Sequence, residues 1–316
     1  MKLIINLPAF NEAEKIGETI KRIPRKISGI DEVLVQVIDD GSQDQTMKIA
    51  EAAGADFVYT NGINRGIGIT FKHATERALD NGADIMVNMD ADGQFDPKDI
   101  EKIIAPILNK EADMVSASRF GNKTAKDMPH MKYYLNKLAA RIIGGFMNYE
   151  IDDLTCGFRA YSRDTLIRLN ITPGFTYTQE TIIDAIGKNL KLKWIPVEVT
   201  YFAGRKSRVV KSIFNYVNQS GKIILEAVRD VRPMKFFGWP ALILILASFG
   251  FFTYFFILYF QDFKISPYKN ILLVAITLLI VGIQFLIFAF IADMIKSARK
   301  LIEDQSHTLK KWRYKK

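Results

Sequence analysis

The sequence is poor in the residues that build many familiar sites. It has one cysteine, Cys156, three histidines and three tryptophans among its 316 residues. A lone cysteine excludes an intrachain disulfide and suits a reducing compartment. No Cys/His pattern has metal-site spacing, so we expect His73, His130 and His307 to be structural or solvated. A Walker-type phosphate loop is also absent, because no Gly-x4-Gly-Lys-Ser/Thr run occurs.

Acidic residues are fewer than basic ones, 34 against 43, which gives a formal net charge of +9. The basic excess concentrates in two stretches, 205–235 and 296–316. Such an excess is typical of proteins that bind nucleic acid, an anionic membrane surface or a phosphorylated substrate. Because these cations flank apolar segments and do not line an aromatic groove, we expect no nucleic-acid partner. The apolar run at the N-terminus is too short for a signal peptide.

Two segments, 236–260 and 270–292, carry no charged residue at all. Each is long enough to cross a ~30 Å hydrocarbon core as a helix. Both are apolar around the whole helix circumference, which disfavours helices buried in a soluble core. The short linker between them predicts a hairpin with both ends on one side of the membrane. Dense Lys and Arg before the first span and after the second predict that both termini are cytoplasmic.

The stretch 209–235 lies between the predicted catalytic domain, 1–208, and the membrane hairpin, 236–295. Its apolar residues recur at helical spacing beside Lys211, Lys222 and Arg229. One interpretation is one or two amphipathic helices in the membrane interface, with cations toward lipid phosphates. The alternative is an ordinary helix packed on the soluble domain. The remaining residues, 296–316, read as a basic cytoplasmic tail.

The first 120 residues alternate between short apolar runs and helical periods. We expect strands at 2–7, 33–38, 56–59, 85–90 and 114–118, and helices at 12–25, 46–53, 69–81 and 97–109. Strands that alternate with helices in this way predict an α/β domain with a mostly parallel sheet and helices on both faces.

One strand ends in a pair of acids, Asp90-Ala91-Asp92-Gly93-Gln94. Ligands bind at such strand ends in open α/β sheets. Two carboxylates this close repel each other unless a cation lies between them. Mg²⁺ and Mn²⁺ take carboxylate ligands and commonly share their remaining positions with substrate phosphate oxygens. The run therefore predicts a metal–diphosphate site, and a solvated acidic turn is the alternative.

Further motifs stand at the other predicted strand ends. They are Pro8 with Asn11-Glu12, Asp39-Asp40-Gly41-Ser42, Asn64-Arg65-Gly66 and, later, Asp153-Leu154-Thr155-Cys156-Gly157-Phe158. In this order the sequence resembles family 2 glycosyltransferases of the GT-A fold, which is Rossmann-like. Within that family it is similar to the polyprenyl-phosphate glycosyltransferases, the dolichyl-phosphate mannose synthase group. Cys156 stands where that group usually has Ser. The resemblance covers about residues 1–235, and the two spans resemble those of members with a short membrane hairpin.

The resemblance implies a role for each matching residue on the donor side. Asp90 and Asp92, with Gln94 nearby, would hold Mg²⁺ or Mn²⁺ against the donor diphosphate, and Asp92 is expected to be catalytic. The residues expected to bind the donor nucleotide are Pro8, Phe10, Glu12, Asp39, Asp40 and Gln94.

On the acceptor side the resemblance implies cations that bind a lipid phosphate. Arg119 matches the family's Ser-Arg and is the first candidate for a catalytic residue that binds the lipid phosphate. A structural salt bridge is the alternative. Lys132 falls where the family usually has a second Arg. The family's Arg-x-x-Gly-x-Ser-Lys is altered here, and Arg205, Ser207 and Arg208 take its place, with a solvated or lipid-facing charge cluster as the alternative. Glu180 matches a family acid near the acceptor and also suits a helix start.

The function implied is an inverting, metal-dependent transfer of one hexose to a polyprenyl phosphate at the cytoplasmic membrane face. The donor would be GDP-mannose, UDP-glucose or UDP-N-acetylglucosamine. One alternative is a family 2 membrane enzyme acting on another lipid or on a growing polysaccharide, although the Gln-x-x-Arg-Trp motif of polysaccharide synthases is absent. Another is a non-catalytic membrane scaffold, against which the intact Asp90 and Asp92 argue. Membrane lipids are expected partners, and the spans could pack between protomers of a homo-oligomer.

Overall fold

The computed structural model describes residues 1–120, 130–170, 177–200, 221–222, 225–226 and 228–315. Its contacts divide the chain into two compact units. The first holds Met1–Leu225 together with Ser306–Lys316, and the second holds Glu226–Gln305. Of the stretch predicted to lie in the membrane interface, residues 209–220 lie outside the described residues.

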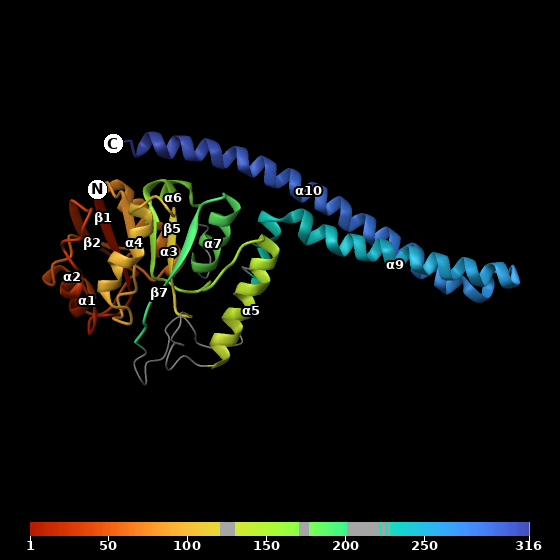
Figure 1. The fold of residues 1–316 in the computed structure, drawn as a ribbon, viewed down its shortest axis with the longest axis horizontal. Coiled ribbons are helices and arrows are strands. Elements are labelled where there is room, and N and C mark those ends of the chain that lie inside the picture. The colour runs from red at the N-terminus through yellow and green to blue at the C-terminus, as the bar shows by residue number, and fades with distance from the viewer. Residues whose placement is uncertain (121–129, 171–176, 201–220, 223–224, 227, 316) are drawn as a thin grey trace. The chain divides into compact units, whose positions relative to one another are not determined.

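A seven-stranded sheet forms the centre of the first unit, in the order β3-β2-β1-β4-β6-β5-β7 (Figure 1). β6 runs antiparallel to β4 and β5, and the other neighbouring pairs are parallel. The mostly parallel α/β sheet predicted from the sequence is confirmed. The strands are β1 (Lys2–Ala9), β2 (Glu32–Asp39), β3 (Phe57–Thr60), β4 (Ile85–Asn88), β5 (Met114–Ser118), β6 (Arg159–Ser162) and β7 (Leu192–Pro196).

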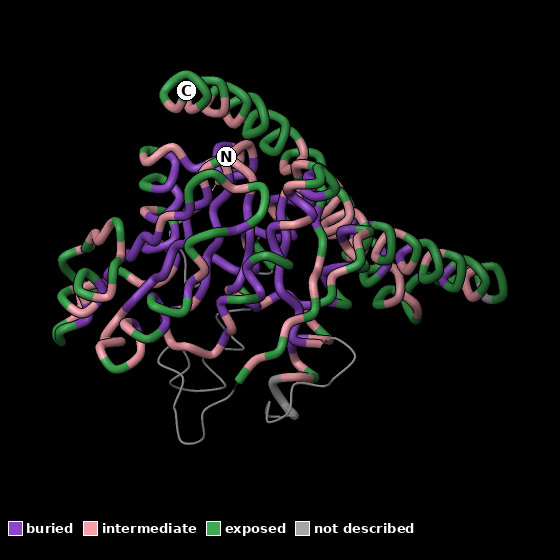
Figure 2. Tube along the Cα trace, turned by 60° about the vertical axis from the view of Figure 1, so that its left-hand side comes forward, coloured by how far each residue is buried: buried purple, intermediate pink, exposed green. Residues whose placement is uncertain are grey.

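Helices cover both faces of this sheet, so its central strands are buried on both sides (Figure 2). On one face, the β1 residues Leu3, Ile5 and Leu7 join a core with Ile16 and Ile103 from two helices. On the other face, Phe71 stacks on Tyr177 with ring centroids 4.0 Å apart. The helices of this unit are α1 (Ile16–Arg22), α2 (Thr46–Ala52), α3 (Ile67–Asp80), η1 (Pro97–Asp99), α4 (Ile100–Leu108), α5 (His130–Met147), α6 (Arg163–Arg168) and α7 (Tyr177–Gly187).

Two predicted elements differ from the structure. The helix expected at 12–25 is shorter, because residues 13–15 form a turn and Ile23 is extended. Ile23 precedes Pro24, whose ring disfavours a helical residue before it. The helix expected at 97–109 is divided into the 3₁₀ turn η1 and α4. β6 and β7 are not among the strands that the sequence pattern predicts.

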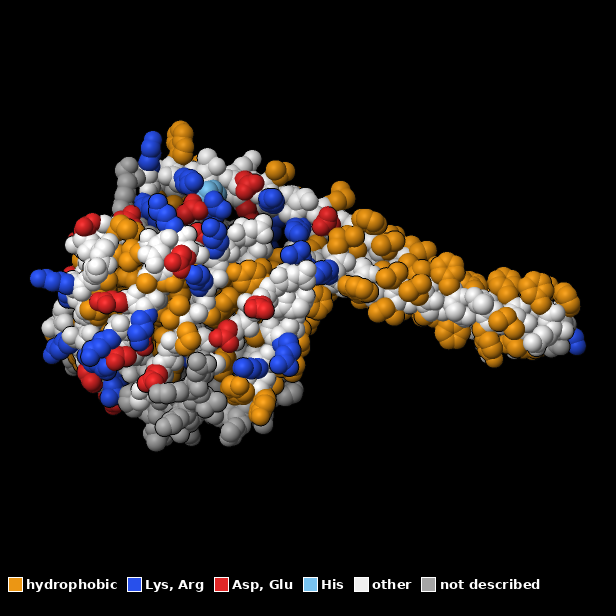
Figure 3. All heavy atoms as spheres, viewed as in Figure 1, with side chains coloured by type: hydrophobic (Ala, Val, Ile, Leu, Met, Phe, Trp, Pro, Cys, Tyr) orange, Lys and Arg blue, Asp and Glu red, His pale blue; other side chains and the backbone are white. Residues whose placement is uncertain are grey.

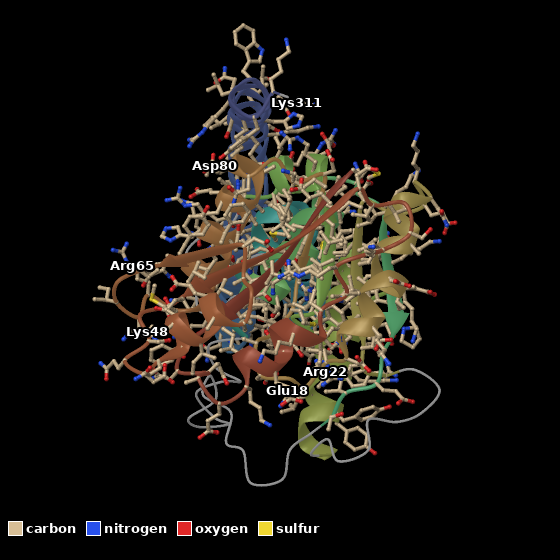
Figure 4. The ribbon with its side chains drawn as sticks, turned by 90° about the vertical axis from the view of Figure 1, so that its left-hand side faces the viewer. Glu18, Arg22, Lys48, Arg65, Asp80 and Lys311 are labelled. Atoms are coloured by element: carbon tan, nitrogen blue, oxygen red, sulfur yellow. The ribbon has the colours of Figure 1, made fainter. Side chains whose placement is uncertain are left out.

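The last residues of the chain belong to the first unit. Lys311 lies 3.7 Å from Asp164 of α6, and Arg313 lies 3.9 Å from Asp80 of α3. Figure 4 labels Lys311 of the C-terminal helix and Asp80 of α3. The basic stretch from residue 296 is helical as far as Arg313. It is therefore a regular helix over most of the length predicted as a tail.

The second unit is a helical hairpin of α9 (Pro233–Asp262), η2 (Ser266–Tyr268) and the larger part of α10 (Lys269–Arg313). Both helices are long and apolar enough to cross a membrane. Hydrophobic side chains cover the visible face of the hairpin (Figure 3).

A line of small residues at seven-residue intervals joins the two hairpin helices, and we call it the seam. Gly282 shows how closely the backbones approach there, since an added Cβ would lie 2.8 Å from Ile245 Cγ1 and 3.2 Å from its backbone nitrogen. The Ser248 hydroxyl donates to the Ala275 carbonyl at 2.8 Å. Small residues permit such contact between membrane helices. The seam consists of Ala241 and Ser248 on α9 and Ala275, Gly282 and Ala289 on α10, all buried.

Candidate functional site

The candidate site lies where several strands end at one edge of the sheet. In the parallel register Ala9 of β1 is beside Asp39 of β2, and Asn6 is beside Asn88 of β4. The loops that follow these three strands therefore leave from the same edge, where open α/β sheets bind ligands. β6 runs the opposite way and begins at Arg159, which pairs with Asn88. The 153–158 loop consequently arrives at the same edge.

The two acids at the end of β2 bind their own loops. The Asp39 carboxylate is fully buried and accepts hydrogen bonds from the Gly41 and Ser42 backbone nitrogens and from the Thr60 hydroxyl. The buried Asp40 carboxylate accepts from the backbone nitrogens of Arg65 and Gly66 at 3.0 and 2.9 Å, and from the Asn61 amide. These acids thus fix the 61–66 loop. Their predicted contact with a nucleotide stays a prediction.

Gly41 allows this loop to approach closely. Its φ of +77° is in the left-handed region, and an added Cβ would lie 2.5 Å from the Ile63 carbonyl carbon. Any side chain would meet backbone atoms there, and backbone cannot move aside as a flexible side chain can. The glycine in the Asp-Asp-Gly-Ser run is therefore required by the local packing.

The loop after β1 is bound to the loop after β2. The Asn11 backbone nitrogen donates to the Ser42 hydroxyl at 2.8 Å, and the Glu12 nitrogen donates to Thr46 Oγ1 at 2.9 Å. Two other predicted donor-site residues stand just before this point. Pro8 is buried within β1, and Phe10 is half-buried immediately after it. The structure brings the predicted donor-binding residues of β1 and β2 together at one edge.

Asp90, Asp92 and Gln94 lie in the loop after β4, and all three are half-buried. The Gln94 nitrogen donates to Asp92 Oδ1 at 3.0 Å. The Gln94 carbonyl in turn accepts from the Thr200 nitrogen at 2.9 Å. Arg22 of α1, labelled in Figure 4, pairs with Asp96 further along this loop at 3.3 Å. The acids therefore stand on a loop held from both sides.

Gly157 packs closely against the Asp90 carboxylate. A Cβ at this position would lie 3.2 and 3.3 Å from the two Asp90 carboxylate oxygens and 3.2 Å from the Tyr177 hydroxyl. Glycine thus permits a close approach that a larger residue could make only by displacing these side chains. Burial, and then the charge of Asp90, raise the pKa of Tyr177 well above its usual value. The phenol accordingly stays protonated, and it donates to the Gly157 carbonyl at 3.3 Å.

A buried chain of amide side chains runs from this point into the sheet. The Asn88 amide donates to the Tyr177 hydroxyl at 2.8 Å, and Asn6 donates to Asn88 Oδ1 at 2.7 Å. Gln36 donates to Asn6 Oδ1 at 3.0 Å. Buried amides have a single satisfied arrangement, so this chain fixes the positions of Tyr177 and the Gly157 loop. Sequence reasoning missed these residues, although three polar side chains inside apolar strands are a signal in themselves.

The residues of this loop suit a hard divalent cation. Asp90 and Asp92 offer carboxylate oxygens, the ligands that Mg²⁺ and Mn²⁺ prefer, and both side chains are half-buried on one loop. No group of three or more His, Cys, Asp or Glu side chains with a metal-binding arrangement occurs among the residues that the structure describes. A cation here would complete its coordination from Gln94, substrate oxygens or water.

Arg119 follows β5, is largely buried and pairs with Asp153. Its Nε donates to Asp153 Oδ2 at 2.7 Å, and its Nη2 donates to Asp153 Oδ1 at 2.8 Å and to Thr155 Oγ1 at 2.6 Å. Burial alone would raise the pKa of Asp153, but the Arg119 charge and hydrogen bonds, with help from Asn136 and the Thr155 nitrogen, hold this pKa below its usual value. The structural salt bridge weighed for Arg119 is present, and phosphate binding by Arg119 stays a prediction.

A second cation, Lys137, has an aromatic neighbour in common with Arg119. Lys137 of α5 places its Nζ 5.8 Å from the centroid of the Phe120 ring and 5.3 Å from that of Tyr133. The Arg119 guanidinium lies 5.8 Å from the same Phe120 ring. Lys137 is thus a candidate that the sequence patterns missed, because it belongs to no motif.

Several predicted acceptor residues cannot be placed. Arg205, Ser207 and Arg208 lie outside the described residues, as does the side chain of Lys132 on α5. Glu180 is half-buried in the first turn of α7, which agrees with a helix-start carboxylate.

The surroundings of Cys156 and His73 favour structural roles for both. Cys156 is buried, and burial raises the pKa of its thiol to about 12, so it is a poor nucleophile. His73 lies 2.7 Å from the Asn61 side-chain oxygen, consistent with a structural role.

Comparisons with known proteins agree with this architecture. Residues 4–169 match the model of glycosyl transferase family 2. A UDP-N-acetylglucosamine–dolichyl-phosphate N-acetylglucosaminyltransferase of Methanococcus voltae is 29% identical over 62% of this chain and 84% of its own. A polyprenol monophosphomannose synthase of Mycolicibacterium smegmatis is 25% identical over 63% of this chain and 77% of its own.

A solved structure shows the same fold. Glucosyl-3-phosphoglycerate synthase from Mycobacterium tuberculosis, in complex with Mn²⁺, UDP-glucose and phosphoglyceric acid, superposes with a TM-score of 0.54 at 22% identity. The match covers 73% of this chain and 79% of that one. The catalytic unit thus has the GT-A fold, and the chain belongs to glycosyl transferase family 2 and is a glycosyltransferase.

Proposed function

We propose that this glycosyltransferase moves one hexose from a nucleotide sugar to a polyprenyl phosphate, with a divalent cation, at the cytoplasmic face of a membrane. The observation that carries the proposal is the loop after β4, where Asp90 and Asp92 stand half-buried at the sheet edge and Gly157 packs closely against the Asp90 carboxylate. Family membership makes the donor an activated sugar. The two relatives described above are named for transfer to dolichyl phosphate and for making a polyprenol phosphomannose.

The donor nucleoside would bind at the ends of β1 and β2, where Pro8, Phe10 and Glu12 adjoin the loop fixed by Asp39 and Asp40. A shaped and rigid loop costs less ordering on binding than a mobile one. The diphosphate would then extend toward Asp90 and Asp92. A divalent cation bound by these two acids would neutralise the charge of the departing diphosphate. The Mn²⁺ in the related fold supports this assignment.

The acceptor phosphate oxygen would attack the anomeric carbon of the sugar. The new carbon–oxygen bond forms as the bond to the nucleoside diphosphate breaks, and that diphosphate leaves with the electron pair. Because the attacking oxygen already carries negative charge, the step needs no strong general base. A single displacement inverts the anomeric centre. The protein's contribution would be alignment of two anions that repel each other, and we propose Arg119 as a source of positive charge on the acceptor side, with Lys137 as a further candidate.

Membrane attachment follows from the same chemistry, because a polyprenyl acceptor stays in the bilayer. We propose that α9 and α10 cross the membrane as a hairpin, with the catalytic unit and both termini in the cytoplasm. The two helices are long and apolar enough to do so, and basic residues flank both outer ends of the pair.

One assay tests the proposal as a whole. The purified full-length protein is incubated with a polyprenyl phosphate, MgCl₂ or MnCl₂, and GDP-mannose, UDP-glucose or UDP-N-acetylglucosamine in turn. Mass spectrometry of the lipid extract should show a gain of one hexose or N-acetylhexosamine with one donor, and EDTA should abolish it. Products with several sugars would support the polysaccharide alternative, and turnover in EDTA would refute metal dependence.

A further inference from the structure

A groove opens at one end of the hairpin, beyond the seam. Its volume is about 590 Å³. The seam continues at seven-residue intervals along α10, and the position after Ala289 is Lys296, which lines the groove. Lys296 thus has a long charged side chain at a position where the earlier members of the seam have small residues, which let the two helices approach. The groove therefore begins where close helix contact ends. Its apolar walls are Phe237 of α9 and Phe288, Ile291, Ala292 and Ile295 of α10.

The same groove carries a cluster of charges. Arg229, Lys296 and Arg299 line it together with one acid, Asp230. Asp230 pairs with Arg229 at 2.8 Å and with Arg299 at 3.2 Å. Arg299 also pairs with Glu303 at 2.9 Å. The residues that line the groove thus include three cations and one acid, and Lys296 makes no ion pair with any residue in the described part of the chain.

We propose that this groove binds one anionic phospholipid of the bilayer, with its phosphate at Lys296 and Arg299 and an acyl chain along Phe237 and Phe288. The argument is complementarity. A soluble anion would leave the aromatic walls without a partner, and a neutral lipid would not use the net positive charge. An amphiphile with a phosphate next to hydrocarbon matches both parts. The inference concerns the hairpin alone and rests on its proposed insertion into a membrane.

The test measures lipid preference. The full-length protein is placed in nanodiscs of phosphatidylcholine with a minor share of phosphatidylglycerol, released in the mass spectrometer, and the retained lipids are counted. We expect one retained phosphatidylglycerol per chain. Lys296→Ala should lower this preference about fivefold, the usual effect of one cation near anionic lipid. Lys300→Ala is the matched control, because it removes the same charge from the same helix and does not line the groove.

A second pair of variants tests the groove without changing charge. Ala292→Trp fills the space between the walls and should reduce phosphatidylglycerol retention. Ile283→Trp adds a similar ring at an exposed position outside the groove and should not. The Lys296 and Lys300 variants test binding of the lipid headgroup, and the Ala292 and Ile283 variants test binding of the acyl chain.

Three results would overturn the proposal. If Lys296→Ala and Lys300→Ala lose the preference for phosphatidylglycerol equally, the preference arises from general surface charge and not from the groove. Unchanged retention in Ala292→Trp would show that no lipid enters the groove. Displacement of phosphatidylglycerol by equimolar polyprenyl phosphate would assign the groove to the acceptor. Failure of the protein to enter nanodiscs would instead refute membrane insertion, and sugar transfer measured separately reports on the proposed reaction.

Discussion

Two strand ends of the catalytic unit each carry a pair of acids, yet the structure uses them differently. Asp39 and Asp40 after β2 are buried, and backbone nitrogens and side chains of their own loops donate to them. Asp90 and Asp92 after β4 are half-buried, and Gly157 packs closely against the Asp90 carboxylate. Similar sequence patterns thus have different structural roles. The first pair fixes its own loops, and the second is the pair that we propose to bind the cation.

The largest effect should come from the β4 pair. We expect Asp92→Asn to reduce sugar transfer at least about a hundredfold, because removal of one electrostatic contact to a developing charge typically has that effect. Thermal unfolding should be unchanged, since the carboxylate is partly exposed. Turnover of the variant is measured with the radiolabelled donor that the wild type uses.

The matched control is the β2 pair. Asp40→Asn points an amide toward backbone N–H donors and should destabilise the fold by about 1–3 kcal/mol. If Asp92→Asn unfolds the protein and Asp40→Asn leaves stability intact, the contrast drawn between the two pairs is wrong.

The next effect in size is expected from a variant that breaks the buried Arg119–Asp153 salt bridge. Arg119→Ala leaves Asp153 without its partner and should cost about 3–5 kcal/mol of unfolding free energy at neutral pH. The pKa of Asp153 is lowered in the fold, so the stabilisation is present above the unfolded pKa and is lost as pH falls through the folded one. The difference between wild type and variant should therefore narrow in acid, as urea unfolding across pH would measure.

A phosphate role for Arg119 would appear as a separate signature. A rise in KM for the lipid phosphate in Arg119→Lys, with stability largely kept, would support it. Equal effects on donor and acceptor KM would mark Arg119 as purely structural.

The smallest expected effect is the difference in stability between alanine variants of two glycines, Gly41 and Gly62. Gly41→Ala should destabilise by more than about 1 kcal/mol, because its Cβ meets the Ile63 backbone in addition to the left-handed φ. Gly62 has a similar φ of +75° but nothing within 4 Å of an added Cβ, so Gly62→Ala should cost only the backbone strain. Equal melting temperatures for the two variants would refute the steric argument.

The hydrophobic pattern of the sequence predicted five of the strands, because strands buried on both faces of a sheet appear as unbroken apolar runs. The two long apolar helices were predicted from uncharged runs of membrane-spanning length. The seam was not predicted, because its small residues lie seven apart and meet only where the two helices pack. The Asn6–Asn88–Tyr177 chain was missed because its members are far apart in sequence and meet only through strand pairing. The Arg119–Asp153 pair was missed as a pair because each residue was assigned to a separate motif.

The reversed direction of β6 has a consequence for how this enzyme can vary. The chain leaves the site edge after β5 and must return to it before β6. The Arg119–Asp153 salt bridge therefore joins the two ends of a connection that includes α5. Changes in the length or composition of this connection need not alter the register of any strand. The strand pairing that positions Asp90 and Asp92 can therefore stay the same while this connection varies.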